Sequence, residues 1–277
     1  MDPGFRRIRV SIWWLVAAGT WLAWNCSHAH SQTVTPPPAP AGCELREGTI
    51  VRGPKEGRRL ALVFTGHEFA EGGQTILDEL AKHRARASFF LTGDFLDNPR
   101  FQGLVRRIVD EGHFLGPHSD RHLLYCTWDK GRKTLVSRAA FATDLSANLK
   151  KIARFGADRP RYFLPPYEHY NKDITAWTAE LGLRLVSFTP GTRSNADYTE
   201  DAAPNFVSSR AIFESIIHRE RRGPRGLNGF LLLLHIGAGP KRTDKFHERF
   251  GELLDDLTAK GYQLVRLDEL LEPKGKP

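Results

Sequence analysis

Seven short apolar runs alternate with helix-like segments along this chain, and this alternation constrains its fold more than any other feature. Continuous apolar strands separated by amphipathic helices are typical of a parallel sheet that is covered on both faces. We therefore predict an α/β fold, a distorted (β/α) barrel of seven strands. The predicted strands span residues 60–64, 87–91, 113–116, 162–164, 183–188, 229–235 and 262–265, and the predicted helices span residues 75–83, 101–111, 136–155, 173–181, 208–221 and 244–260.

Titratable residues cluster immediately after the predicted strands. In a barrel of this kind the carboxyl ends of all strands meet at one rim, and active sites lie at that rim. Polar loops at strand ends would explain one or two such clusters, but five are better explained by a shared site. The clusters are His67 and Glu68 after the first strand, His118 and His122 after the third, Tyr167, Glu168 and His169 after the fourth, Arg193 after the fifth, and His235 at the end of the sixth.

The amino terminus has the layout of a secretory signal. Three arginines precede an apolar run over residues 10–24, which is short for a membrane span, and residues 29–31 fit a small-x-small cleavage site. We expect residues 1–31 to be a signal peptide and residues 32–43 to be a proline-rich, extended linker. A lipoprotein signal acylated at Cys26 and an uncleaved anchor are the alternatives. The predicted location is therefore periplasmic or secreted, with no stable membrane span after cleavage.

The rest of the chain, residues 44–273, is predicted to form one domain with ample core. Loss of the signal lowers the formal net charge from +8 to +6, a mild excess that favours acidic surfaces or anionic glycans. No basic block with interleaved aromatic residues indicates nucleic-acid binding. Cys43 and Cys126 either pair in an oxidising compartment or remain two thiols, and the sequence leaves both open.

His118 and His122 are the strongest candidates for a metal site. Two imidazoles four residues apart lie on the same side of one turn, and neutral imidazole is the commonest protein ligand for zinc-like metals. The spacing alone equally describes two surface histidines. The other clusters on the predicted rim favour the metal site.

Four segments resemble the polysaccharide deacetylases, the metal-dependent carbohydrate esterases that include chitin, peptidoglycan and nodulation-factor deacetylases. Residues 112–122 are similar to the Gly-His lead-in and the metal-binding His-Ser/Thr-x-x-His motif of that family. Residues 87–93 resemble its second strand, residues 165–167 its Arg-x-Pro-Pro-Tyr loop, and residues 233–235 its final Leu-x-His motif. The resemblance covers roughly residues 58–267 and implies a barrel fold, a divalent metal and deacetylation of a glycan.

The resemblance breaks at the first motif. The family ends its first strand with Thr-Phe-Asp-Asp-Gly, whose first Asp is the general base and whose second is a metal ligand. Here the corresponding text is Val63-Phe64-Thr65-Gly66-His67, without either carboxylate, and Leu164 replaces the arginine that normally braces the base. An arginine without its carboxylate partner would be an uncompensated charge beside a cation, so the two losses together indicate a rearranged site.

Nearby residues are candidates for the missing roles. His67 is predicted to complete a metal site with His118 and His122, with Glu68 as the general base. The reverse assignment, with Glu68 as the metal ligand and His67 as the base, stays open. Glu168 is a second candidate base. The other assignments are Pro166 and Tyr167 to substrate contact, the backbone N–H of Tyr167 to the oxyanion, His235 to protonation of the leaving group, and His169 to a place near the rim.

The predicted activity is metal-dependent removal of acetyl groups from a polysaccharide or oligosaccharide, N-acetyl before O-acetyl. The predicted cofactor is one divalent metal, zinc before cobalt or nickel. A non-catalytic carbohydrate-binding domain on the same scaffold is the first alternative, and hydrolysis of another amide or ester bond is the second. Tyr125, Trp128 and Trp177 are assigned to the core rather than to a sugar-stacking platform, and the polar loops 195–198 and 241–244 have no assigned role.

Overall fold

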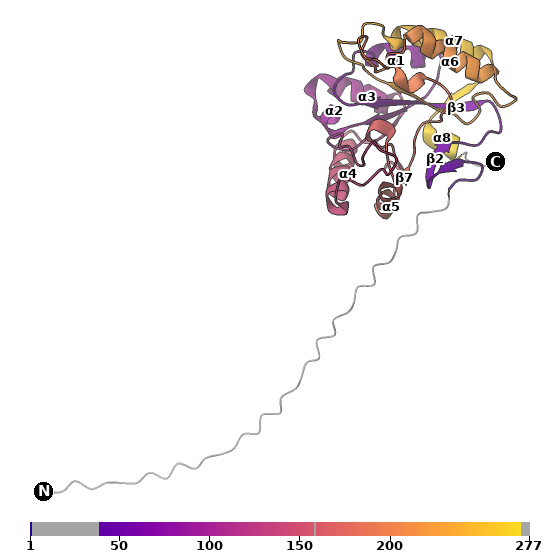
Figure 1. Ribbon diagram of the computed structural model, residues 1–277. Helices are drawn as coiled ribbons and strands as arrows, with labels where there is room; N and C mark the ends of the chain where they lie inside the picture. The colour runs from indigo at the N-terminus through magenta and orange to yellow at the C-terminus, as the bar shows by residue number, and fades with distance from the viewer. Residues whose placement is uncertain (2–38, 158, 273–277) are drawn as a thin grey trace, which may run out of the picture. The chain divides into compact units, whose positions relative to one another are not determined.

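The computed structural model of the protein describes residue 1 and residues 39–157 and 159–272 (Figure 1). The predicted signal, with Cys26, and most of the predicted linker lie outside these residues. All helices and strands described below belong to one compact unit. Among these residues, no helix has both the length and the apolar character that crossing a membrane requires.

Five parallel strands form the main sheet. Its spatial order is β5 (Phe114–Pro117), β4 (Ser88–Leu91), β3 (Arg59–Gly66) and β8 (Leu231–His235), and β9 (Gln263–Val265) pairs with the beginning of β3. β3 is therefore central. Each of these strands was predicted to within two residues.

Two further strands extend the main sheet into an open ring. β6 (Tyr162–Phe163) and β7 (Arg184–Leu185) pair in parallel as a separate sheet. One backbone hydrogen bond links this pair to the main sheet on each side: the N–H of Leu164 donates to the carbonyl of Pro117 (3.3 Å), and the N–H of Thr189 donates to the first residue of β8 (3.0 Å). The predicted distorted (β/α) barrel fold is confirmed, but β6 and β7 pair as a separate sheet, so no continuous ladder closes the barrel.

Six helices occupy the predicted helical segments. Figure 1 shows α1, α6 and α7 together on one side of the main sheet and α4 and α5 on the other. Capping residues explain where three of them begin, because Ser137, Asn171 and Ser208 each accept a hydrogen bond from a backbone N–H of the first turn. The bounds are α1 (Gly73–Lys82), α3 (Gln102–Asp110), α4 (Arg138–Ala153), α5 (Lys172–Glu180), α6 (Ser209–Arg221) and α7 (Phe250–Ala259).

The short elements were not predicted. Each has only three to five residues, too few to show a periodicity. Arg52 in β2 is buried, and its guanidinium donates to the carbonyl of Asn228 (2.9 Å), so this strand depends on contacts far along the chain. The elements are β1 (Glu44–Arg46), β2 (Thr49–Arg52), α2 (Gly93–Asp97), α8 (Leu267–Leu271) and the 3₁₀ helices η1 (Pro99–Phe101), η2 (Pro166–Glu168), η3 (Ser194–Ala196) and η4 (Phe246–Arg249).

The side chains of β3 alternate between two cores. Leu62 and Phe64 pack beneath the helices, in the larger core. Ala61 and Val63 belong to the core inside the ring. By the same alternation Thr65 faces the inside of the ring at the carboxyl end of β3, which is the rim where the sequence predicted the site.

The two cysteines do not pair with each other. Cys43 is half-buried and Cys126 is buried, and both are free thiols. Burial raises the pKa of the Cys43 thiol to about 11. Neither thiol is therefore activated as a nucleophile at neutral pH.

Candidate active site

The loop that follows β5 presents His118 and His122. His118 is only 2% exposed, and its Nδ1 lies 2.8 Å from the carbonyl oxygen of Leu164. Because a carbonyl only accepts, Nδ1 carries the proton and Nε2 keeps a free lone pair. The ring of His122 is 5.2 Å from that of His118, with the two planes tilted by 52°. The two rings are thus neighbours without being stacked on each other.

Both imidazoles are neutral near neutral pH. Burial lowers the pKa of His122 to about 3, and the positive charges of His67 and His235 add to this effect. Burial also lowers the pKa of His118 well below its ordinary value. The neutral ring is the form that binds a metal.

Asp144 in α4 holds this loop in place. Its buried carboxylate accepts the backbone N–H groups of Asp120 (3.0 Å) and Arg121 (3.1 Å) and the hydroxyl of Tyr125 (3.1 Å). Three hydrogen bonds from one loop to one carboxylate fix the backbone between the two histidines.

Asn148, one turn further along α4, supports the same loop. Its Oδ1 accepts the N–H of His118 (3.0 Å), and its Nδ2 donates to the carbonyl of Leu91 (3.1 Å). The sequence prediction missed both Asp144 and Asn148. The available signal was their position on the buried face of α4, among the apolar residues Phe141 and Leu145.

His67 is not oriented as a third metal ligand would be. Its ring is stacked on that of His122, with centroids 4.5 Å apart and planes within 13° of parallel. A metal lies in the plane of each imidazole that binds it, about 2.0–2.1 Å from the nitrogen, and nearly parallel stacked planes share no such point. Within residues 39–157 and 159–272, no three His, Cys, Asp or Glu side chains are arranged to hold a metal. The orientation of His67 thus differs from that expected of a third ligand, and the metal site of His67, His118 and His122 stays a prediction.

Glu68 lies on the outer side of this cluster. Its side chain is 67% exposed, and its carboxylate is 3.8 Å from Nε2 of His67. The other ring nitrogen of His67 is 3.1 Å from the hydroxyl of Thr92. Glu68 therefore faces solvent, whereas His67 contacts both Glu68 and the ring of His122.

His235 and Asp197 form a second functional group at the rim. Nδ1 of His235 is 2.6 Å from one carboxylate oxygen of Asp197, and the backbone N–H of His235 donates to the other (2.8 Å). Burial acts to lower the pKa of His235, but the charge and hydrogen bond of Asp197 outweigh it and the pKa is raised. Asp197 therefore orients the imidazole and favours its protonated form, as a general acid requires.

Asp197 was missed because its loop carries no motif. The buried guanidinium of Arg242 organises this region by donating to the carbonyls of Thr199 (2.8 Å), Val207 (2.9 Å) and Asp244 (2.7 Å). The two polar loops without an assigned role are thus joined to each other. Together they place Asp197 against the end of β8.

Glu168 lies within electrostatic reach of this pair. It follows Tyr167 in η2, and both residues have positive φ angles, 51° and 59°. Burial raises the pKa of Glu168 to about 7, with the charge of His235 opposing the rise and that of Asp197 adding to it. A carboxylate with this pKa suits proton abstraction near neutral pH.

The remaining predicted residues divide between the rim and its surroundings. Tyr167 is 45% exposed, and its ring lies 4.4 Å from that of His122. Pro166 is buried before it. His169 instead contacts the hairpin before it: its Nε2 bonds the carbonyl of Thr127 (2.9 Å) and its ring stacks on Trp128.

The two positions that lack the expected carboxylates have different surroundings. Thr65 is 2% exposed and pairs with His235 in the register of β3 and β8, and its hydroxyl has no hydrogen-bond partner among the described residues. Gly66 faces the opposite core, where an added Cβ would lie 2.7 Å from Ile236 and 2.9 Å from Leu91. A hydroxyl therefore faces the site at position 65, whereas a side chain at position 66 would require the neighbouring core side chains to shift.

Comparison with known proteins places these features in context. The sequence profile of the polysaccharide deacetylases matches residues 52–186. A peptidoglycan-N-acetylglucosamine deacetylase of Bacillus cereus is 26% identical over 222 residues, which make up 79% of this chain and 70% of the relative. A solved peptidoglycan N-acetylglucosamine deacetylase superposes with a TM-score of 0.65 at 21% identity, covering 82% of this chain and 94% of that one.

A solved pseudoenzyme shares the fold as well. This carbohydrate esterase family 4 pseudoenzyme from Bacillus anthracis has a TM-score of 0.63 at 19% identity, covering 82% of this chain and 70% of that one. A mutant of it is described as having restored enzymatic activity. The scaffold therefore accommodates both active and inactive sites.

Proposed function

Because the chain belongs to the polysaccharide deacetylase family, we propose that it hydrolyses acetyl groups on a glycan, N-acetyl before O-acetyl. The observation that supports this most is the shared rim, where neutral His118 and His122 lie within the electrostatic influence of the His235–Asp197 pair. The predicted signal segment supports action in the periplasm or outside the cell, with a lipoprotein anchored at Cys26 as the alternative.

The family is generally metal-dependent, and two residues of this chain fit a divalent cation. His118 and His122 would hold it, since both are neutral and their rings lie 5.2 Å apart without being stacked. Imidazole donors favour zinc, with cobalt or nickel as alternatives. When bound, such an ion polarises the acetyl carbonyl and makes bound water more acidic.

The acid–base steps belong to the chain's own residues. Glu168 accepts the proton of the attacking water, and the backbone N–H of Tyr167 donates to the developing oxyanion. His235, protonated and oriented by Asp197, donates a proton to the leaving amine as its bond to the acetyl carbon breaks. The products are acetate and a free amine on the sugar.

Glu168 is a better general base than Glu68. The raised pKa of Glu168 lets it accept a proton at neutral pH, and it lies near the acid, His235. Glu68 is 67% exposed and contacts His67 instead. The unpartnered hydroxyl of Thr65 gives the site a group that can orient water in place of the missing carboxylate.

Acetate release tests this assignment. We would incubate the metal-loaded protein with chitin oligosaccharides and peptidoglycan fragments, comparing wild type with Glu168→Gln and Glu68→Gln. Loss of a general base lowers turnover by about 10²–10⁴-fold, so Glu168→Gln is expected to fall by that amount and Glu68→Gln to stay within a few-fold. If Glu68→Gln lost more activity than Glu168→Gln, Glu68 would be the general base instead.

A glycan-binding role without turnover is the second candidate. The packed surroundings of Gly66 and the stacking of His67 favour it, because both reduce the number of metal ligands at the site. Binding of acetylated oligosaccharides with no acetate release, in a preparation shown to contain metal, would support this candidate. Release of another product from amide or ester substrates would instead indicate hydrolysis of a different bond.

A further inference from the structure

Trp128 belongs to the surface beside the candidate site, contrary to its assignment to the core. It is 63% exposed, whereas Tyr125 is buried as predicted. Its indole stacks on the ring of His169 at 4.4 Å and meets the ring of Tyr167 edge-on at 5.7 Å. Tyr167 in turn contacts His122. A continuous row of aromatic rings therefore leads from the metal-binding loop to the surface.

Trp128 is carried by an ordered hairpin, residues 126–134. Cys126 and Thr134 form an antiparallel bridge, and the N–H of Thr127 donates to the carbonyl of Lys133 (2.9 Å). The carboxylate of Asp129 accepts the N–H of Gly131 (2.7 Å), which shapes the tip. Because these bonds already hold the hairpin, little ordering entropy is lost when a ligand binds Trp128.

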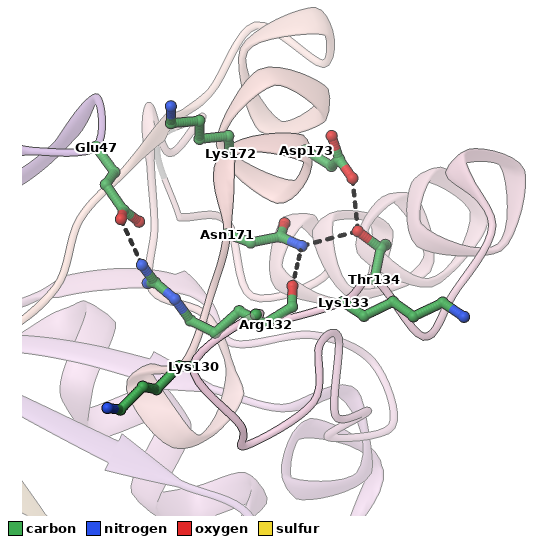
Figure 2. A pocket seen from close by; sticks show the side chains of 9 residues that line it. Glu47, Lys130, Arg132, Lys133, Thr134, Asn171, Lys172 and Asp173 are labelled. Carbon is green, nitrogen blue, oxygen red and sulfur yellow. Dashed lines mark hydrogen bonds and ion pairs between the residues drawn. The ribbon is translucent and has the colours of Figure 1, made fainter.

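A pocket of about 550 Å³ lies between this hairpin and the start of α5 (Figure 2). Figure 2 shows Asn171 at its centre, where the amide donates to the carbonyl of Arg132 and to the hydroxyl of Thr134, both at 2.8 Å. Thr134 donates to Asp173 (2.6 Å). These bonds join the hairpin to α5, so hydrogen bonds between the two segments fix the shape of the pocket.

The pocket carries free positive charge. Glu47 pairs with Arg132, and Asp173, which accepts from the hydroxyl of Thr134, is the other carboxylate, so the lysines outnumber the unpaired carboxylate. Three lysines at its edge, Lys130, Lys133 and Lys172, are exposed, and no ion pair within the described part of the chain involves them. In Figure 2 their side chains extend away from the bonded centre, on different sides of the pocket.

Trp128 and Lys130 are close enough to contact one sugar chain, and Lys133 and Lys172 line the same pocket as Lys130. Lys130 follows Trp128 by two residues, so their Cα atoms are at most about 7 Å apart. Aromatic faces bind the apolar faces of sugar rings, and exposed ammonium groups on flexible stems bind carboxylates. Stacking and charge thus act on neighbouring parts of a ligand that extends from the rim.

We propose that Trp128, Lys130, Lys133 and Lys172 form a subsite for a carboxylated sugar unit, next to the unit that loses its acetyl group. The substrate class is then an acetylated glycan that bears carboxylates. This inference rests on the proposed deacetylase function, because that function places an acetylated sugar at the rim. The hairpin selects the glycan, while the histidines and Glu168 act on it.

Two oligosaccharides that differ in carboxylates test the subsite. A hyaluronan hexasaccharide alternates N-acetylglucosamine with a carboxylated sugar, whereas an N-acetylglucosamine hexamer is neutral. Calorimetric titration of the full chain at low salt is expected to give about three- to tenfold tighter binding of the hyaluronan oligosaccharide, the gain that a few exposed ion pairs supply. Salt should reduce this preference, because it screens exposed charges.

Variants assign the preference to the hairpin. Lys130→Ala/Lys133→Ala should bring the affinity ratio close to one, and Trp128→Ala should weaken binding of both oligosaccharides. Lys82→Ala/Lys150→Ala removes the same charge elsewhere and should keep the wild-type ratio. Equal affinities in wild type, or a preference that survives Lys130→Ala/Lys133→Ala, would overturn the subsite.

Acetate release, measured in parallel, separates this inference from the proposed function. A preference for the carboxylated ligand that depends on the lysines, without acetate release from any substrate, would keep the subsite and reject the deacetylase. Acetate release without that preference would keep the deacetylase and reject the subsite.

Discussion

The rings of His67 and His122 lie one on the other, with centroids 4.5 Å apart and planes within 13° of parallel. This stacking separates the roles of three histidines that the sequence placed together. His118, tilted by 52° to His122 and fixed by its bond to Leu164, remains the natural partner of His122 for a metal. His67 instead packs against one face of the His122 ring.

Metal content is expected to follow this division. Removing His118 or His122 takes away one of two proposed ligands, so His118→Ala and His122→Ala should lose the bound ion. His67→Ala removes only a stacked ring and should retain it. Mass spectrometry of the purified proteins after incubation with zinc gives the ion-to-protein ratio. If His67→Ala loses the metal as fully as His118→Ala, the stack opens on binding and His67 is a ligand.

The pH profile of kcat/KM should have an acid limb set by Glu168. Burial raises its pKa to about 7, and the groups that act on it are His235 and Asp197. Glu168 accepts a proton only when ionised, so activity should fall as the pH drops through about 7.

The alkaline limb should reflect loss of the proton from His235, whose pKa lies above its ordinary value because of Asp197. Asp197→Asn removes the charge that outweighs burial, so the pKa of His235 should fall and the alkaline limb should move to lower pH. A limb that does not move in this variant would show that another group is the acid.

Restoring the missing carboxylate at position 66 should destabilise the protein. The Cβ of Gly66→Asp would lie 2.7 Å from Ile236, and overpacking of a core typically costs about 1–3 kcal/mol in the free energy of unfolding. Urea unfolding measures the change. Gly103→Asp is a matched control, because Gly103 lies in the first turn of α3 with nothing within 4 Å of an added Cβ. An acidic residue there should be close to neutral.

The contrast with the pseudoenzyme from Bacillus anthracis makes this test informative. A mutant of that protein has restored activity. A stable Gly66→Asp variant with increased metal affinity would contradict the packing argument and show that the core yields around position 66.

Asp144→Asn should loosen the loop between His118 and His122. The amide replaces one carboxylate oxygen by a donor, which leaves a backbone N–H or the hydroxyl of Tyr125 without an acceptor. An unsatisfied buried polar group costs about 1–3 kcal/mol, so the free energy of unfolding and the metal affinity should both fall. Asp78→Asn, at an exposed position of α1, provides the comparison. Wild-type metal affinity in Asp144→Asn would show that the loop holds its shape without this carboxylate.

The sequence by itself determined the seven parallel strands, the six main helices and the rim on which the site lies. Apolar periodicity sets these features, because it records which face of each segment is buried, and capping residues such as Ser137, Asn171 and Ser208 mark where helices begin. His118, His122, Glu168 and His235 were found in the same way, from their places after strands.

Only the tertiary structure decided which chemical role each of these residues can take. Asp197 meets His235 from 38 positions away, and Asp144 in α4 bonds the loop between His118 and His122. The angle between two imidazole planes and the desolvation that raises the pKa of Glu168 above that of an ordinary carboxyl arise from packing between distant segments. Neither has a local pattern, because both depend on which side chains surround a group rather than on its neighbours along the chain.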